Sequence, residues 1–327
     1  MDTGLVAVRK AIEFGSPDHL PCYHSDPEAP PTDMVGIPYV WRKIASTADT
    51  YTTEWGFVVR PNTLGPGYHV DYHPILDWKD YARYAFPDVK LAKQEITRAH
   101  EARLAKDPAC TAGKYVMGHI CAGPYLYVGM IRREDNFFMD LLSEKERVSE
   151  LFGRVMDYQI ALFRHFADLG AHGVLIHEDW GSSHGLIMSP ASWREIFLPH
   201  YVRACQACHA RGLHFCIQVT GNVAEIIPDL IAMKLDVLFY PEPRVIGIDR
   251  LARLVRGKMC AFASADWKAT LPNGTPDDVR ADVRELVERI AVPEGGLGFW
   301  LICMSSFYTE ANRRAQIAEY RRLRQRG

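Results

Sequence analysis

The chain of 327 residues is 48% hydrophobic, which is enough to bury a large core. Its formal net charge of −2 gives no electrostatic reason to expect a nucleic acid or an anionic membrane surface as a partner. Its longest apolar runs have the length of a strand, and its first residues lack the basic and apolar regions of a signal peptide. We therefore expect a cytoplasmic protein with reduced cysteines that acts on a small molecule.

The predicted elements begin with a short amphipathic helix at the N-terminus. Residues 24–80 are rich in proline, tyrosine, tryptophan and glycine, and we expect loops and short insertions there. Short apolar runs, separated by longer helical patterns, recur along the chain. The expected strands are Leu20–Tyr23, Gly56–Arg60, Tyr115–Cys121, Gly173–His177, His214–Val219, Val237–Tyr240, Met259–Ala263 and Phe299–Cys303.

Three of the intervening helices carry clear start signals. Ser143 and Glu146 have the spacing of a capping box and predict a helix from Ser143 to about Leu169. Ser189 and Thr275 each precede a proline, as an N-cap residue precedes the first helical position. These signals place helices between the expected strands.

Eight nearly all-apolar strands that alternate with helices indicate a parallel sheet buried on both faces. The simplest arrangement is a single α/β domain over residues 1–327. It closes as a (β/α)8 TIM barrel with the irregular N-terminal loops over its mouth. The competitor is an open doubly wound sheet. No G-x-G-x-x-G or Walker loop follows any expected strand, which weakens that competitor.

Several segments follow one another in the order and spacing of a known family. Residues 212–230 contain an apolar strand that leads into Gly221-Asn222 and a helix, and residues 170–181 end in Glu-Asp-Trp-Gly. These segments resemble the uroporphyrinogen decarboxylase superfamily, and the resemblance covers nearly the whole chain. The other matching segments are 9–21, 54–56, 86–88, 123–124, Asn136 with Asp140, 189–190 with Pro199, and Asp266 with 271–276.

Two departures from the family pattern bear on which branch of the superfamily this chain resembles. In the zinc-dependent, corrinoid-linked methyltransferases of this superfamily, the His and Cys of His-x-Cys-Gly-Asn bind the metal, whereas Gln218 and Thr220 stand there in this chain. True uroporphyrinogen decarboxylases carry an arginine-containing loop after the first strand, where this chain has Tyr23–Glu28. Arginine suits bidentate carboxylate binding, so its absence argues against a porphyrinogen substrate. The resemblance thus implies the branch that moves methyl groups from methanol, methylamines or aryl methyl ethers to a corrinoid or thiol.

Candidate functional residues stand at the carboxyl ends of the strands, where barrel enzymes carry their sites. Glu178 and Asp179 follow one strand, and because neighbouring side chains point in opposite directions, we expect one to face the mouth and the other a helix N-terminus. Both are candidate catalytic acids or bases, together with Asp26 and Asp266. The plain alternative is that Asp179 only caps a turn. The candidates for substrate binding are Gln218, Thr220, Asn222, Glu242, His184 and Trp267.

A metal is a further expectation with an open alternative. Neutral amide and hydroxyl oxygens are poor zinc ligands, so Gln218 and Thr220 break the zinc set that the resemblance implies. A relocated zinc site would combine a second His-x-Cys pair, a neighbouring histidine and the cysteine that ends the last expected strand. Its ligands are His119, Cys121, His177 and Cys303. The alternative is that these residues only pack in the core. A corrinoid is expected on a separate partner protein.

Three interpretations of function follow. The first is a methyltransferase of the uroporphyrinogen decarboxylase-like type that acts on a small ether, alcohol or amine, as in O-demethylation. The second is a cofactor-free decarboxylase or lyase on a small carboxylated substrate, using Asp26 or Asp266. The third is a barrel that binds a ligand or partner without catalysis.

Overall fold

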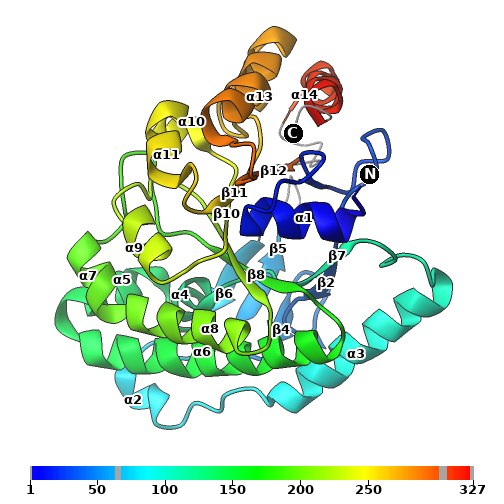
Figure 1. Ribbon diagram of the computed structural model, residues 1–327. Coiled ribbons are helices and arrows are strands. Elements are labelled where there is room, and N and C mark those ends of the chain that lie inside the picture. The colour runs from blue at the N-terminus through cyan, green and yellow to red at the C-terminus, as the bar shows by residue number, and fades with distance from the viewer. Residues whose placement is uncertain (1, 63–67, 302–307, 325–327) are drawn as a thin grey trace.

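The computed structural model describes residues 2–62, 68–301 and 308–324. In this part of the chain, eight parallel strands form one sheet in the order β1-β12-β11-β10-β9-β8-β7-β2. The sheet curls into a nearly closed TIM barrel with helices around it, as the sequence predicts (Figure 1). Its strands are β1 (Cys22–Tyr23), β2 (Met34–Tyr39), β7 (Tyr115–Ile120), β8 (Gly173–Glu178), β9 (His214–Val219), β10 (Val237–Tyr240), β11 (Cys260–Ala263) and β12 (Leu297–Trp300).

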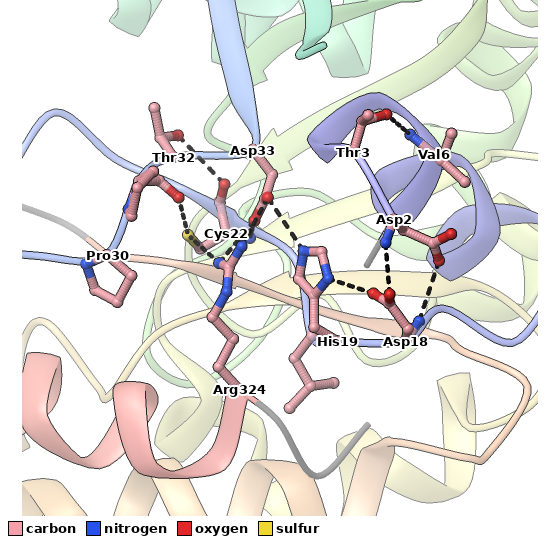
Figure 2. Close-up of polar contacts among 12 residues, drawn as sticks. Asp2, Thr3, Val6, Asp18, His19, Cys22, Pro30, Thr32, Asp33 and Arg324 are labelled. Carbon is pink, nitrogen blue, oxygen red and sulfur yellow. Dashed lines mark hydrogen bonds and ion pairs between the residues drawn. The ribbon is translucent and has the colours of Figure 1, made fainter.

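Asp33 closes the seam between β1 and β2, the two ends of that strand order. Its N–H donates to the Cys22 carbonyl at 3.0 Å, and its carboxylate accepts from the Cys22 N–H at 2.8 Å. Arg324, just after α14 (Glu310–Leu323), donates to both oxygens of this carboxylate at 2.8 Å. His19 contacts it at 3.2 Å (Figure 2). The last helix is thereby tied to the seam of the barrel.

The first helix, α1 (Gly4–Glu13), covers the amino end of the barrel. Its Val8 and Ile12 pack with Met34 and Tyr115, which begin β2 and β7. The other helices surround the sheet or lie in its loops. They are α2 (Trp78–Tyr81), α3 (Val89–Lys106), α4 (Pro124–Arg132), α5 (Glu134–Ser143), α6 (Lys145–Asp168), α7 (Pro190–Ile196), α8 (Leu198–His209), α9 (Ile227–Ala232), α10 (Pro243–Ile246), α11 (Ile248–Val255), α12 (Thr270–Asn273) and α13 (Pro276–Ile290).

The second barrel strand is not the predicted one. The sequence predicted Gly56–Arg60, whereas the structure uses β2, which contains Gly36 and Pro38 and therefore reads as a loop. Proline is tolerated there because β2 pairs with β7 only and ends the strand order. The segment at 56–60 instead contributes to a separate four-stranded antiparallel sheet of β3 (Lys43–Ser46), β4 (Tyr51–Thr53), β5 (Val58–Pro61) and β6 (Tyr68–Tyr72).

This smaller sheet packs against α4 through aromatic side chains. The ring of Trp55 lies 4.6 Å from that of Tyr127 on α4, measured between centroids. The ring of Trp41 makes T-shaped contacts with the rings of Phe57 and Tyr127, whose centroids lie 5.4 and 6.1 Å from its own. The region expected to be irregular is therefore a structured insertion whose β6 runs beside the mouth.

The helix start signals had mixed outcomes. Ser189 and Thr275 cap α7 and α13 as predicted, the latter in a capping box. The start at Ser143 is wrong, because this residue ends α5 and its hydroxyl donates to the Met139 carbonyl at 3.2 Å. Within the described ranges, no helix has both the length and the apolar character needed to cross a membrane.

Candidate active site

The inner face of the barrel ends in a polar layer at the carboxyl ends of three neighbouring strands. Alternation along β7, β8 and β9 turns His119, His177 and Gln218 inward. Nε2 of His119 lies 2.5 Å from Nε2 of His177, and Nδ1 of His177 contacts Oε1 of Gln218. These three side chains form a continuous hydrogen-bonded row, called here the histidine row.

The row fixes which ring nitrogens carry protons. The amide oxygen of Gln218 can only accept a hydrogen bond, so Nδ1 of His177 donates to it. In the neutral imidazole, Nε2 of His177 therefore carries no proton. Nε2 of His119 then donates to it, which leaves Nδ1 of His119 as an acceptor. Burial lowers the pKa of His119 to about 4, and burial together with His119 lowers that of His177 to about 3. Both imidazoles are neutral at pH 7, so the row offers an acceptor without a positive charge.

Aromatic rings complete the floor of the mouth beside the histidine row. Trp300, the last residue of β12, lies 6.4 Å from His177 and 5.7 Å from Phe239 between ring centroids. Tyr23, which ends β1, lies 6.4 Å from Phe239. The sequence did not point to Trp300 or Phe239 as site residues. Their place at the ends of apolar runs was the available signal.

Asp179 stands on the rim above this floor. Thr220 donates a hydrogen bond to its carboxylate at 2.5 Å. Asp179 also lines a cavity of about 730 Å³ between β6 and the helices α4 and α5, called here the rim cavity. Burial and the neighbouring charge of Asp179 raise the pKa of the Tyr68 hydroxyl, which lies in the same cavity. Its lining includes Tyr68, Met130, Arg133, Glu134, Asp135 and Asp179.

Glu178 points to the opposite side of β8, into the helix layer. It is fully buried, and its Oε1 accepts from the N–H of Tyr125 at 3.3 Å, in the first turn of α4, and from the Tyr201 hydroxyl. Burial raises its pKa to about 8. The expectation that these two carboxylates face opposite ways agrees with these contacts. A catalytic role for Glu178, however, does not fit its position, because a layer of backbone separates it from the mouth.

Glu242 and Trp267 link the loops around the mouth through hydrogen bonds. Oε1 of the buried Glu242 accepts from the indole N–H of Trp267 and from Lys268, both at 2.7 Å. Its Oε2 accepts from the N–H of Gly221 at 2.8 Å. These contacts join the loops that follow β9, β10 and β11. Both residues therefore hold the mouth together, and their expected contact with substrate has no support in this geometry.

The two aspartates expected for a decarboxylase lie apart from the histidine row. Asp266 accepts from the backbone N–H groups of Arg244 at 3.0 Å and of Ala269 at 2.8 Å, so it organises two loop turns. Asp26 pairs with Arg313 at the start of α14. Each carboxylate is buried and is bound by the neighbouring groups just named. The structure does not bring them together.

Asn222 and His184 occupy loops next to the rim. The Asn222 side-chain oxygen accepts from the N–H of Ala224 at 3.3 Å, which is a local cap. The exposed His184 contacts the Ser183 hydroxyl at 3.0 Å. Neither side chain contacts the histidine row through a hydrogen bond in the described residues. Of the residues expected to bind substrate, the structure thus places Gln218 and Thr220 at the mouth.

The described residues do not by themselves fit a zinc ion. Zinc takes three or four protein donors, and only His119 and His177 converge at the floor. Across residues 2–62, 68–301 and 308–324, no three histidine, cysteine, aspartate or glutamate side chains gather as a metal site requires. Cys121 follows β7 and is exposed, and Cys303 lies outside the described residues. Gln218, where the family resemblance implies a metal ligand, is instead a partner of His177.

Comparison with known proteins agrees with this architecture. The family model described as uroporphyrinogen decarboxylase (URO-D) matches residues 63–298, which is most of the chain. None of the curated protein sequences matches.

Among solved structures, a methyltransferase from Methanosarcina mazei is similar over 98% of this chain and 99% of its own, with a TM-score of 0.70 and 14% identity. A B12-independent methionine synthase from Shewanella sp. W3-18-1 aligns over 72% of this chain and 66% of its own, with a TM-score of 0.46 and 10% identity. At such identities, the first likeness shows the fold, and the second carries no argument.

Proposed function

The chain belongs to the uroporphyrinogen decarboxylase family, and on that premise we propose that it is a methyltransferase. It takes a methyl group from a small methylated compound and passes it to a nucleophile, either a thiol or a corrinoid on a separate partner protein. The observation that carries this proposal is the uncharged histidine row at the carboxyl ends of β7, β8 and β9. The fold shared with a methyltransferase supports it.

Methyl transfer by direct displacement requires alignment of donor and acceptor more than it requires charge on the floor. Nδ1 of His119 is the acceptor that the row offers to a hydroxyl of the bound compound, and Gln218 keeps His177, and through it His119, in the required tautomer. Asp179, held by Thr220, supplies the charge at the rim. A docked corrinoid would supply a strong nucleophile for the methyl carbon.

The decarboxylase alternative is less consistent with these contacts. A carboxylated substrate requires cationic side chains that bind its carboxylate. Arg133, the cation that lines the rim cavity, is engaged by Asp135 in two hydrogen bonds of 2.6 Å. The two aspartates proposed for that chemistry, Asp26 and Asp266, are bound to Arg313 and to backbone N–H groups.

Methyl transfer from 13C-labelled donors to an alkanethiol or to free cob(I)alamin tests the proposal. His119→Leu removes the free acceptor, so we expect kcat/KM to fall by at least about a hundredfold. Glu178→Gln is the matched control, since it changes a carboxylate on the same strand that faces away from the mouth. It should keep the wild-type rate. Equal activity of His119→Leu and wild type would remove the histidine row from the mechanism.

A further inference from the structure

The rim cavity has an excess of negative charge. Its charged side chains are Arg133 and the three carboxylates of Glu134, Asp135 and Asp179. Arg133 and Asp135 neutralise each other through a bidentate pair. Among the described residues, no arginine or lysine pairs with Glu134 or Asp179. Two uncompensated carboxylates therefore face the cavity.

The remaining wall suits a compact organic cation. The ring of Tyr68 and the thioether of Met130 line the cavity, and aromatic faces attract cations. A volume of about 730 Å³ lies in the range of small-molecule sites. Charge and shape thus favour the same kind of ligand.

The chemistry of the leaving group points the same way. An ether or alcohol that loses its methyl group needs a proton on the departing oxygen. Burial raises the pKa of the Tyr68 hydroxyl, which lines the cavity, so this group is a poor proton donor at pH 7. A methyl group on an atom that is already positively charged departs without a proton.

We propose that the rim cavity binds a methyl donor that is permanently cationic, with a quaternary ammonium or sulfonium centre facing Asp179 and Glu134. This inference rests on the proposed function and names its substrate class. In the transfer, the bond between the methyl carbon and the nitrogen or sulfur breaks. The electron pair stays on that atom, which leaves as a neutral amine or sulfide. The methyl carbon bonds to a lone pair of a thiolate acceptor, and no proton or oxidant is needed.

Calorimetric titration of the full chain with choline, with trimethylsulfonium and with 3,3-dimethylbutan-1-ol, the neutral carbon analogue of choline, tests the proposal. A cation should bind at least about tenfold more tightly than the neutral alcohol, because a carboxylate at close range contributes more than 1.4 kcal/mol. Which of the two cations binds more tightly identifies the centre as ammonium or sulfonium.

Asp179→Asn and Glu134→Gln should each weaken binding of the preferred cation about tenfold. Asp277→Asn, whose side chain is 91% exposed on α13, is the matched control and should bind as wild type does. If Asp179→Asn does not fold, Glu134→Gln carries the test, since Glu134 is exposed at the start of α5. Equal binding of choline and its neutral analogue, or unchanged binding in Glu134→Gln, would overturn the inference.

Binding is measured without a methyl acceptor, so the experiments can reject the cation site and the methyltransferase activity independently. Cation binding without methyl transfer keeps the cation site and rejects the methyltransferase. Methyl transfer from ethers without cation binding rejects the cation site alone.

Discussion

Replacing the buried Glu178 by glutamine should make the stability of the protein less sensitive to alkaline pH. The carboxyl is fully buried between β8, the first turn of α4 and Tyr201, and its Oε2 has no hydrogen-bond partner among the described residues. Burial therefore disfavours the charged form and raises the pKa to about 8 from an ordinary value of 4.5. Glutamine keeps the shape and the accepting oxygen but cannot ionise.

The sign follows from proton uptake. Between pH 4.5 and 8, the folded protein keeps the Glu178 proton, whereas the unfolded chain has released it. Folding then takes up a proton, so the free energy of unfolding falls as pH rises, by about 1.4 kcal/mol per pH unit. Between pH 5 and pH 8.5 the free energy of unfolding therefore falls by about 4 kcal/mol. The fall stops near pH 8, the pKa of Glu178 in the folded protein. Glu178→Gln should lack this loss.

Urea denaturation of the wild type and Glu178→Gln between pH 5 and 9 measures the effect. The difference between the two free energies of unfolding cancels the other titrating groups, which both proteins share. It should shift in favour of the variant by about 4 kcal/mol as pH rises. A difference that stays constant with pH would refute the assignment of Glu178 as a buried, protonated carboxyl.

Three further predictions concern the mouth, the histidine row and the seam. Gly221→Ala should cost at least about 1 kcal/mol more stability than Gly247→Ala. Both glycines have a positive φ, of 75° and 86°, but only at Gly221 would the added methyl meet backbone, at 2.0 Å; equal losses in chemical denaturation would contradict this. The wild type should lose stability as pH falls from 6.5 toward 4, because the pKa values of His119 and His177 are lowered to about 4 and 3 and the unfolded chain takes up protons first. Ring titration of either histidine near pH 6.5 by NMR would contradict the lowered values. Arg324→Ala should destabilise the fold by about 3 kcal/mol, since it removes the arginine partner of a buried aspartate at the barrel seam. A loss below about 1 kcal/mol in thermal denaturation would show that the seam does not depend on this pair.

The barrel could be predicted from the sequence because most of its strands are apolar on both faces. His214–Val219 and Val237–Tyr240 agree with β9 and β10 to the residue. β2 could not be recognised in this way, since Gly36 and Pro38 are typical of loops and are tolerated only by its position at the end of the strand order. The local sequence pattern therefore does not predict a strand such as β2, whose residues are tolerated only because of its place in the sheet.

The candidate site was predicted in part for a similar reason. The strand ends pointed to His177, Gln218 and Asp179, which do lie at the mouth. Sequence parity alone could not tell which of Glu178 and Asp179 faces inward, because that depends on which side of the strand the barrel axis lies. Glu134 was also missed, since it is brought to the rim by α5 from a segment that carries no strand-end signal.

The most direct test of the proposed methyltransferase is to follow 13C from labelled methyl donors in a single turnover. Choline labelled in its N-methyl groups, a labelled methyl ether and a labelled carboxylated compound would each be mixed with the full chain and an alkanethiol or cob(I)alamin. We predict that the label from the ammonium compound appears on the acceptor, together with the neutral amine. Release of labelled carbon dioxide without any methylated acceptor would contradict methyl transfer and identify a decarboxylase instead.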